Sequence, residues 1–305
     1  MFSEKIMSLS ARKIVENLRI KKNEIVLIIS DDQNERIAKD IKVEAKRKGA
    51  IVSIALIEKG YSNEPPKPIA NAMKKADVVI CPLKWSLTHT RATQQACKAG
   101  ARVATLPDIN EKIYKSKVFL SDPKDYRRLT KKLAKILNKG NKVEITNIKG
   151  TDISFSIKNR KAKEDLGIIR KGNCGNLPGG EVFIAPIENS ANGIMVDWEG
   201  KIIEVKDGKI IAIKGKYAKK LYRWIEKHKN ANIIAEFGIG TNPKAKFKGT
   251  VLIDEKVLGT CHIAFGNNIN FGGINKSTTH YDRIIERPTI KIDGKLIMKN
   301  GRLFV

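Results

Sequence analysis

The first half of the chain alternates short apolar runs with amphipathic stretches. Helical periodicity appears in residues 33–48, where Ile37, Ile41 and Ala45 share one stripe, and Gly49 ends the pattern. The apolar runs are short and rich in β-branched residues, which is typical of strands buried on both faces; they span residues 24–30, 51–57, 77–81 and 102–106. Strands that alternate with helices predict a parallel, doubly wound sheet.

The pattern changes after a long basic amphipathic helix, which we predict over residues 122–138. Beyond this helix, short segments alternate polar and apolar residues with period two, as strands with one buried face do. Asp-Gly pairs at residues 207–208 and 293–294 predict hairpin turns between such strands. One predicted helix, near residues 216–229, interrupts them.

These patterns define the expected fold class and domains. A chain of 305 residues exceeds one typical domain, so two domains are the default. We predict an α/β protein in which a doubly wound, Rossmann-like parallel-sheet domain (residues 1–140) precedes a β-rich α+β domain (residues 141–305). Residues 139–142 are the predicted linker.

The composition indicates a globular protein of the cytoplasm. The sequence has no apolar run long enough to cross a membrane, and its start lacks the hydrophobic region of a signal peptide. The four cysteines are scattered, without a Cys-x-x-Cys pair, which argues against a zinc ribbon and a disulfide scaffold. We therefore expect a cytoplasmic protein without a membrane partner.

The net charge of +27 raises nucleic acid as a partner. However, lysines are spread along the whole chain and are interleaved with acids, as in residues 35–40. The sequence has no arginine-rich tail, helix-turn-helix signature or RNA-binding aromatic motif. We expect a solvated lysine surface and no specific nucleic-acid partner.

The predicted parallel sheet carries no nucleotide signature, because neither a Gly-x-Gly-x-x-Gly motif nor a Walker loop is present. Ser86, Thr88, His89 and Thr90 follow the third predicted strand, where such sheets often bind ligands. His89 could contact a substrate there. The alternative is that the hydroxyl groups cap the next helix.

Candidate chemistry is concentrated between Glu236 and Asp282. His280 and Asp282 are two residues apart, so both side chains lie on the same face of an extended strand, as two metal ligands can. His262 lies between an apolar run and a glycine-rich turn, and Glu236 ends an apolar run. Acids and histidines beside apolar segments are costly without partners, which favours a metal site. The alternative is hydrogen-bonded core residues.

Glu181 is a further candidate. It follows a predicted tight turn that ends in two glycines, and it precedes an apolar strand. The alternative is an ordinary solvent-facing residue at the start of a strand.

Four segments together resemble the M29 metallo-aminopeptidases and their shorter relatives, which include the 2,5-dihydroxypyridine dioxygenases. The segments occur in family order and cover most of residues 170–285; they are residues 177–186, 235–243, 254–266 and 279–282. The segment around Thr88 and the α/β first domain also fit the shorter relatives.

The resemblance implies a divalent metal site and hydrolysis of an N-terminal peptide bond or a related small amide. In the aminopeptidases a pair of metals, Zn²⁺, Co²⁺ or Mn²⁺, activates water and polarises the carbonyl. Glu181 and Glu236 are the implied catalytic acids, and a small peptide or other small molecule is the implied substrate. We also expect a homo-oligomer. The implied metal ligands are Glu181, Glu236, His262, His280 and Asp282.

Two departures from the aminopeptidase pattern keep alternatives open. Gly180-Glu181 stands where the aminopeptidases have two adjacent acids, and residues 267–270 lack their catalytic tyrosine. The first alternative is a non-haem Fe²⁺ ring-cleaving dioxygenase that acts on a dihydroxypyridine-like substrate. Its facial set of two histidines and one carboxylate would be His262, His280 and Asp282. The second alternative is a binding protein without turnover.

Overall fold

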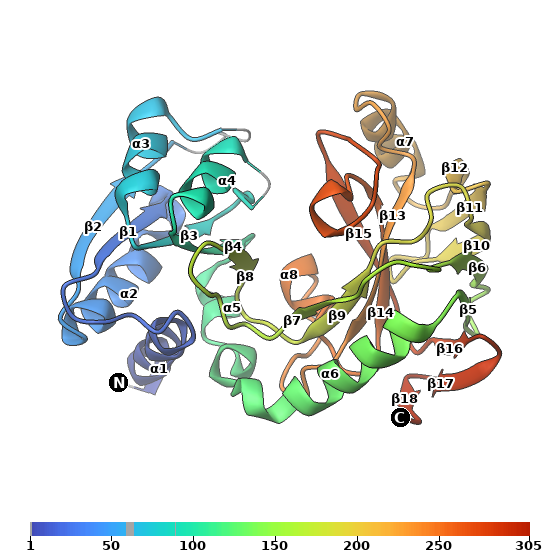
Figure 1. Cartoon of the computed structure of the whole chain (residues 1–305), viewed down its shortest axis with the longest axis horizontal. Helices are drawn as coiled ribbons and strands as arrows, with labels where there is room; N and C mark the ends of the chain where they lie inside the picture. The colour runs from blue at the N-terminus through green and yellow to red at the C-terminus, as the bar shows by residue number, and fades with distance from the viewer. Residues whose placement is uncertain (1, 59–63, 89) are drawn as a thin grey trace. The chain divides into compact units, whose positions relative to one another are not determined.

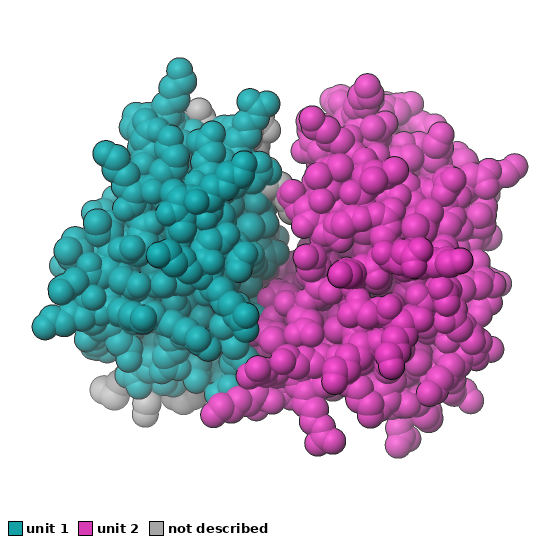
Figure 2. Space-filling model, in the orientation of Figure 1, with its two compact units in different colours: residues 1–123, 167–179 teal, residues 124–166, 180–305 magenta. Residues whose placement is uncertain are grey.

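The computed structural model describes residues 2–58, 64–88 and 90–305, and His89 therefore lies outside the described residues. The chain divides into two compact units, which Figure 2 colours separately. Unit 1 comprises residues 1–123 and 167–179. Unit 2 comprises residues 124–166 and 180–305.

A parallel sheet forms the centre of unit 1, because its three inner strands are apolar and buried on both faces. The run at residues 51–57 forms a partly exposed edge strand instead. The strand order is β2-β1-β3-β4-β8, and every neighbouring pair is parallel. Its strands are β1 (Ile25–Ser30), β2 (Ile51–Leu56), β3 (Val78–Leu83), β4 (Arg102–Pro107) and β8 (Cys174–Asn176).

Helices cover the sheet of unit 1, with α1 and α2 on one face and α3 and α4 on the other (Figure 1). Thr90 caps α4, since its hydroxyl accepts a hydrogen bond from the Thr93 amide. The helices are α1 (Phe2–Asn17), α2 (Glu35–Arg47), α3 (Lys67–Lys75), α4 (Arg91–Lys98) and α5 (Glu111–Tyr114), and the 3-10 helices are η1 (Asp32–Asn34) and η2 (Lys117–Leu120).

Unit 2 consists of two antiparallel sheets and three helices. The eight-stranded sheet has the order β12-β11-β10-β6-β5-β16-β17-β18, and the five-stranded sheet has the order β15-β14-β13-β9-β7. The larger sheet contains β5 (Lys142–Thr146), β6 (Asp152–Ser156), β10 (Asn192–Val196), β11 (Ile202–Lys206), β12 (Lys209–Lys214), β16 (Thr289–Ile292), β17 (Lys295–Lys299) and β18 (Arg302–Leu303). The smaller contains β7 (Lys163–Asp165), β9 (Glu181–Ile184), β13 (Ile234–Gly240), β14 (Cys261–Gly266) and β15 (His280–Ile285). The helices are α6 (Pro123–Lys139), α7 (Ala218–Glu226) and α8 (Val251–Asp254), and η3 (Ile269–Phe271) is a 3-10 helix.

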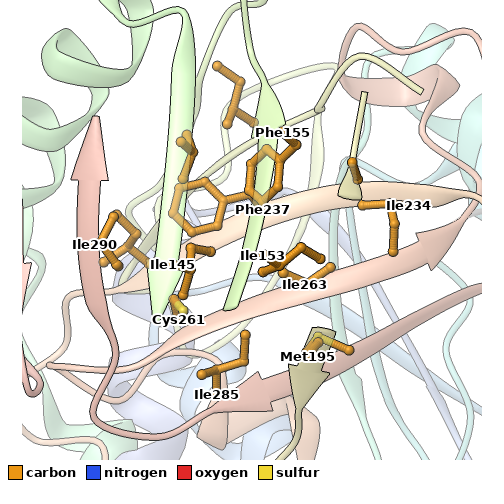
Figure 3. Packing of buried hydrophobic residues seen from close by; sticks show 14 of the residues in the cluster. Ile145, Ile153, Phe155, Met195, Ile234, Phe237, Cys261, Ile263, Ile285 and Ile290 are labelled. Carbon is orange, nitrogen blue, oxygen red and sulfur yellow. The ribbon is translucent and has the colours of Figure 1, made fainter. Parts of the chain in front are cut away.

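The core of unit 2 lies between these two sheets, because alternate side chains of each strand point toward the other sheet. The rings of Phe155 and Phe237 meet edge to face with centroids 5.4 Å apart. Figure 3 shows this packing, with Ile145, Ile153 and Phe155 of the larger sheet beside Phe237, Cys261 and Ile263 of the smaller.

The predicted fold class is confirmed: a doubly wound parallel sheet is followed by a β-rich α+β unit. The unit boundaries differ from the predicted domain boundary at residue 140. Helix α6 and residues 139–142 lie inside unit 2, since Leu133 and Leu137 of α6 pack into its core. Residues 167–179 return to unit 1, where β8 pairs with β4.

None of the helices in the described ranges is both long and apolar enough to span a membrane.

Candidate metal centre

One face of the five-stranded sheet of unit 2 carries the candidate residues, and the opposite face packs into the core of that unit. His262 pairs with Gly238 of β13, and Ala264 pairs with both Glu236 and Asp282 across neighbouring strands. Because side chains alternate along a strand, the polar residues gather on one face while Cys261, Ile263 and Phe265 enter the core on the other. The polar face brings together all five residues predicted from the sequence: Glu181, Glu236, His262, His280 and Asp282.

The Glu236 carboxylate joins the two histidines. Its Oε1 lies 3.3 Å from Nε2 of His262, and its Oε2 lies 3.3 Å from Nε2 of His280. The His280 Nε2 is also 3.3 Å from Oδ1 of Asp282. A nitrogen and carboxylate oxygens converge on one point, as the ligands of a metal ion do.

The opposite ring nitrogen of His280 is held by the backbone. Its Nδ1 donates a hydrogen bond to the carbonyl oxygen of Asn267, 2.8 Å away. This bond places the proton on Nδ1 and aims Nε2 at the carboxylates, which is how metal-binding histidines are usually oriented. The segment that lacks the aminopeptidase tyrosine thus supplies the orienting carbonyl. Tyr281 points to the opposite face, where its ring packs against Trp224.

Glycines make room for the acidic and imidazole groups. A Cβ atom at Gly238 would lie 2.1 Å from Cε1 and Nε2 of His262, so the imidazole occupies the space of a side chain. Gly180 has a φ of +126° and approaches Asn242 closely, and an acid would be strained there. Position 180 therefore cannot supply a second acid beside Glu181 in this backbone conformation.

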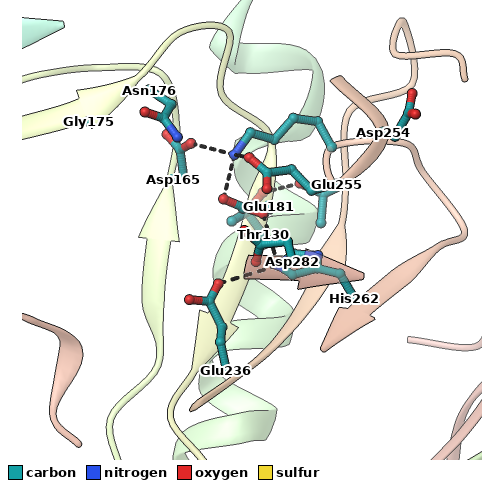
Figure 4. Close-up of polar contacts among 12 residues, drawn as sticks. Thr130, Asp165, Gly175, Asn176, Glu181, Glu236, Asp254, Glu255, His262 and Asp282 are labelled. Atoms are coloured by element: carbon teal, nitrogen blue, oxygen red, sulfur yellow. Dashed lines mark hydrogen bonds and ion pairs between the residues drawn. The ribbon is translucent and has the colours of Figure 1, made fainter. Parts of the chain in front are cut away.

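A buried lysine lies beside these residues. Lys256 follows α8, and its ammonium group contacts Asp165 at 3.1 Å, Glu255 at 2.8 Å and Glu181. Figure 4 shows these three carboxylates gathered near His262 and Glu236. We call Asp165, Glu181, Glu255 and Lys256 the lysine cluster.

The ligand atoms form two neighbouring groups in the described part of the chain. The Glu236 group comprises Glu236, His280 and Asp282, and the Glu181 group comprises Glu181, Glu255 and His262. Within each group the candidate ligand atoms all lie within 4.8 Å of one another. The three residues of the expected facial set are therefore divided, with His262 in one group and the other two in the second.

The sequence interpretation did not assign Glu255 or Lys256. Both lie within a segment that carries the family resemblance, residues 254–266, but neither was considered as part of the site. The available signal was the run Asp254-Glu255-Lys256 between two apolar stretches. Three successive charges in such surroundings are buried only when they are paired.

Burial and neighbouring charges shift the pKa values in opposite directions. Burial raises the pKa of Glu181 to about 8, although Lys256 opposes the shift. Burial alone would lower the pKa of His262, but its hydrogen bond to Glu236 and the nearby carboxylates raise it to about 9. Burial likewise works against charge on Asp282, yet His280 lowers the pKa of this carboxyl group. Such opposed shifts in one cluster are typical of functional sites.

The residues present fit a divalent metal ion. In the Glu236 group, His280 Nε2 lies 3.3 Å from both Glu236 Oε2 and Asp282 Oδ1, so an ion could replace the imidazole proton between them. Glu181 Oε2 and His262 Nδ1 are buried and have no hydrogen-bond partner among the described residues. Mixed imidazole and carboxylate ligands suit Zn²⁺, Mn²⁺, Co²⁺ and Fe²⁺ alike. The Glu236 group is the more accessible of the two, since its His280 and Asp282 side chains are 12% and 15% exposed while His262 is fully buried.

Unit 1 has its own polar cluster at the carboxyl ends of its strands. The Thr88 hydroxyl lies 2.7 Å from the Thr105 hydroxyl, and both bond to the side chain of Asn176. Thr90 and Glu64 cap α4: the Glu64 carboxylate accepts hydrogen bonds from the backbone amides of Arg91 and Ala92.

A protein family and several solved structures match this chain. The family model described as 2,5-dihydroxypyridine 5,6-dioxygenase matches residues 7–305. A comparison with curated protein sequences gives no match. Because the model spans nearly the whole chain, the match includes both units and every residue of the Glu236 and Glu181 groups.

Two solved structures share the fold along their whole lengths. The 2,5-dihydroxypyridine dioxygenase of Pseudomonas putida KT2440 has a TM-score of 0.80 and 18% identity, with coverage of 98% of this chain and 97% of that chain. Wild-type AmpT from Thermus thermophilus has a TM-score of 0.75 and 17% identity, with full coverage of both chains. The chain therefore has the fold that the dioxygenases share with the M29 aminopeptidases.

Proposed function

Because the chain belongs to the 2,5-dihydroxypyridine 5,6-dioxygenase family, we propose that it is a metal-dependent dioxygenase that opens a dihydroxypyridine-like ring. The observation that carries this proposal is the family match over residues 7–305, which extends through the candidate site. In this reaction the bond between carbons 5 and 6 of the ring breaks, and each of these carbons receives one atom of the O₂ molecule. No separate reductant is required, because the ring itself supplies the electrons.

The Glu236 group would hold the ion, with His262 adjacent to it through the shared Glu236 carboxylate. When bound, Fe²⁺ would supply the redox chemistry for the reaction of the substrate with O₂. The chain itself orients His280 through the Asn267 carbonyl, and this fixes the nitrogen that faces the ion.

Glu181 would accept the proton that a ring hydroxyl releases on binding. Its Oε2 is buried, accepts no hydrogen bond among the described residues and lies 3.4 Å from Nε2 of His262. Burial raises its pKa to about 8, so the group can take up and return a proton near neutral pH.

Hydrolysis of an N-terminal peptide bond or a small amide is the second candidate. The observation that favours it is the surplus of acids: Glu181, Glu236 and Glu255 lie in the two groups together with Asp282. A single Fe²⁺ ion needs only one carboxylate in its facial set. Two divalent ions that activate water would use more of them.

An assay under air and under argon decides between the two reactions. Protein loaded with Fe²⁺, Mn²⁺ or Zn²⁺ is given 2,5-dihydroxypyridine or an aminoacyl-arylamide. For the dioxygenase we expect O₂ uptake with Fe²⁺ and dihydroxypyridine, and no arylamine release. His280→Ala should lose the O₂ uptake. His228→Ala should retain it, because that partly exposed histidine bonds Thr278 outside the site.

If the protein releases arylamine independently of O₂, and Glu236→Ala abolishes this release, the dioxygenase proposal is wrong and the protein is a hydrolase. If the protein binds metal but catalyses neither reaction, the remaining function is binding without turnover.

A further inference from the structure

Lys256 is fully enclosed, and its ammonium group has a carboxyl partner for each of its donors. The side chain is 0% exposed. An ammonium group has three N–H donors, and three carboxylates surround this one: Asp165 at 3.1 Å, Glu255 at 2.8 Å and Glu181. A lysine is rarely buried so completely unless it is paired in this way.

Two of these partners belong to the Glu181 group. The candidate metal-binding atoms of Glu181 and Glu255 lie within 4.8 Å of His262. A cation bound there would share both carboxylates with the Lys256 ammonium and would lie next to its positive charge. Two cations a few ångströms apart in a buried site repel each other strongly.

The Glu236 group has no such internal cation. Within the described ranges, Glu236 and Asp282 form ion pairs with His262 and His280 and with no lysine or arginine. A histidine can give up its proton to bind a metal ion, whereas the ammonium group of a lysine is not a metal ligand while it keeps its charge. This group is thus free to take an ion, and the lysine cluster already contains a positive charge.

We propose that Lys256 takes the place of a second metal ion, so that the chain binds one divalent ion at the Glu236 group and none at the Glu181 group. The inference rests on the proposed function only in its assumption that the Glu236 group holds a metal. It explains how a site with so many acids serves one ion: three of the acids contact the ammonium group of Lys256.

The test is metal stoichiometry in the full-length chain. Protein stripped with EDTA is titrated with Mn²⁺ by calorimetry, and the bound metal is counted by elemental analysis after dialysis. The wild type should bind one equivalent. Lys256→Gln removes the charge and should bind a second equivalent. Its affinity for this second ion should exceed that of the wild type by roughly a hundredfold or more. Electron paramagnetic resonance should then show coupling between two Mn²⁺ ions.

Two matched variants separate charge from general damage. Lys256→Arg keeps a positive charge and should retain one equivalent. Lys135→Gln makes the same chemical change on an exposed lysine of α6 and should also retain one equivalent. A second equivalent in either of these would overturn the proposal, as would a single equivalent in Lys256→Gln.

Glu255→Gln keeps the inference testable if Lys256→Gln does not fold. Because Glu255 contacts the ammonium group and not a metal in the proposal, this variant should still bind one equivalent. Two equivalents in the wild type that fall to one in Glu255→Gln would overturn the proposal. The count is independent of O₂ uptake, so one equivalent without turnover refutes the dioxygenase and leaves the role of Lys256 standing.

Discussion

The absence of a side chain at Gly238 determines where the His262 ring can lie. A Cβ atom there would come within 2.1 Å of two ring atoms on the paired strand. Gly238→Ala should therefore displace the imidazole and weaken metal binding by about 10- to 100-fold, as changes to groups that orient metal ligands commonly do. Calorimetric titration with Mn²⁺ measures this change.

Gly175→Ala is the control for that substitution. Gly175 also lies in a strand, but a Cβ atom there would meet only ordinary contacts with Ile169, the nearest at 3.6 Å. We expect unchanged metal affinity in Gly175→Ala. Equal affinity in Gly238→Ala and the wild type would show that His262 takes no part in the site.

The metal-free protein should lose stability as the pH rises toward 9. The folded state raises the pKa of His262 from 6.5 to about 9, so its contribution is complete below pH 6.5 and is lost as the pH rises through 9. Glu181 acts in the same direction between its ordinary value of 4.5 and about 8. The melting temperature of the metal-free chain, measured from pH 6 to 9.5, should fall across this range.

His262→Gln should flatten this pH dependence, since it removes the group with the higher pKa. In the wild type, metal binding should become tighter as the pH rises from 6 to 9.5, because a histidine must lose its proton to bind an ion. A melting temperature that rises from pH 7 to 9 would contradict the assigned shifts.

At the level of elements, the positions of strands could be predicted from the sequence better than the pairing of strands within the sheets. The runs at 24–30 and 77–81 became β1 and β3 because β-branched residues buried on both faces give a strong local signal. The three-residue strand β8 contains Cys174, Gly175 and Asn176 and has no such signal. Only its pairing with β4 defines it, and pairing between distant segments has no local pattern.

The same distinction applies to the site. His280 and Asp282 could be placed on one face by their spacing. Glu236, His262 and Glu181 were candidates because they stand beside apolar runs and glycines, and the family resemblance implied that all five residues bind metal. The partners of Lys256 could not be predicted, because Asp165 reaches it from β7, far away in the sequence. Whether each of the five residues binds metal stays a prediction that the titrations above test.

The strand β15 also anchors unit 2 through its core-facing side. Arg283 donates from Nε to Oδ2 of Asp197 at 2.7 Å, and both side chains are nearly inaccessible. Asp197→Ala should destabilise the protein by about 3–5 kcal/mol, because it removes the buried partner of the Arg283 guanidinium group and leaves only the more exposed Glu199 as an acidic partner. Urea denaturation measures this loss.

Glu204→Ala provides the comparison for Asp197→Ala. Glu204 pairs with Lys214 at 2.6 Å in an exposed position, and such pairs contribute about 0–1 kcal/mol. If the two alanine variants lose equal stability, the Arg283–Asp197 pair is not the anchor that its burial indicates.

For the whole molecule, the charge of +27 predicts weak, unselective attraction to polyanions. Fluorescence anisotropy with labelled duplexes of two unrelated sequences should show equal affinities, both falling by at least about tenfold between 50 and 200 mM salt. Tight binding to one sequence at the higher salt would contradict the expectation that nucleic acid is not a specific partner. The expected homo-oligomer likewise stays a prediction, which light scattering tests.

The return of residues 167–179 to unit 1 has a consequence for synthesis on the ribosome. The β4 edge of the parallel sheet remains open until β8 has been translated, since the Val103 amide donates to the Asn173 carbonyl and the Leu177 amide donates to the Thr105 carbonyl. By then α6 and the first strands of unit 2 have already emerged. Neither unit is one uninterrupted piece of the gene, so a cut at residue 123 yields a sheet that lacks its last strand. Recombination that exchanges the units must therefore transfer two segments of each.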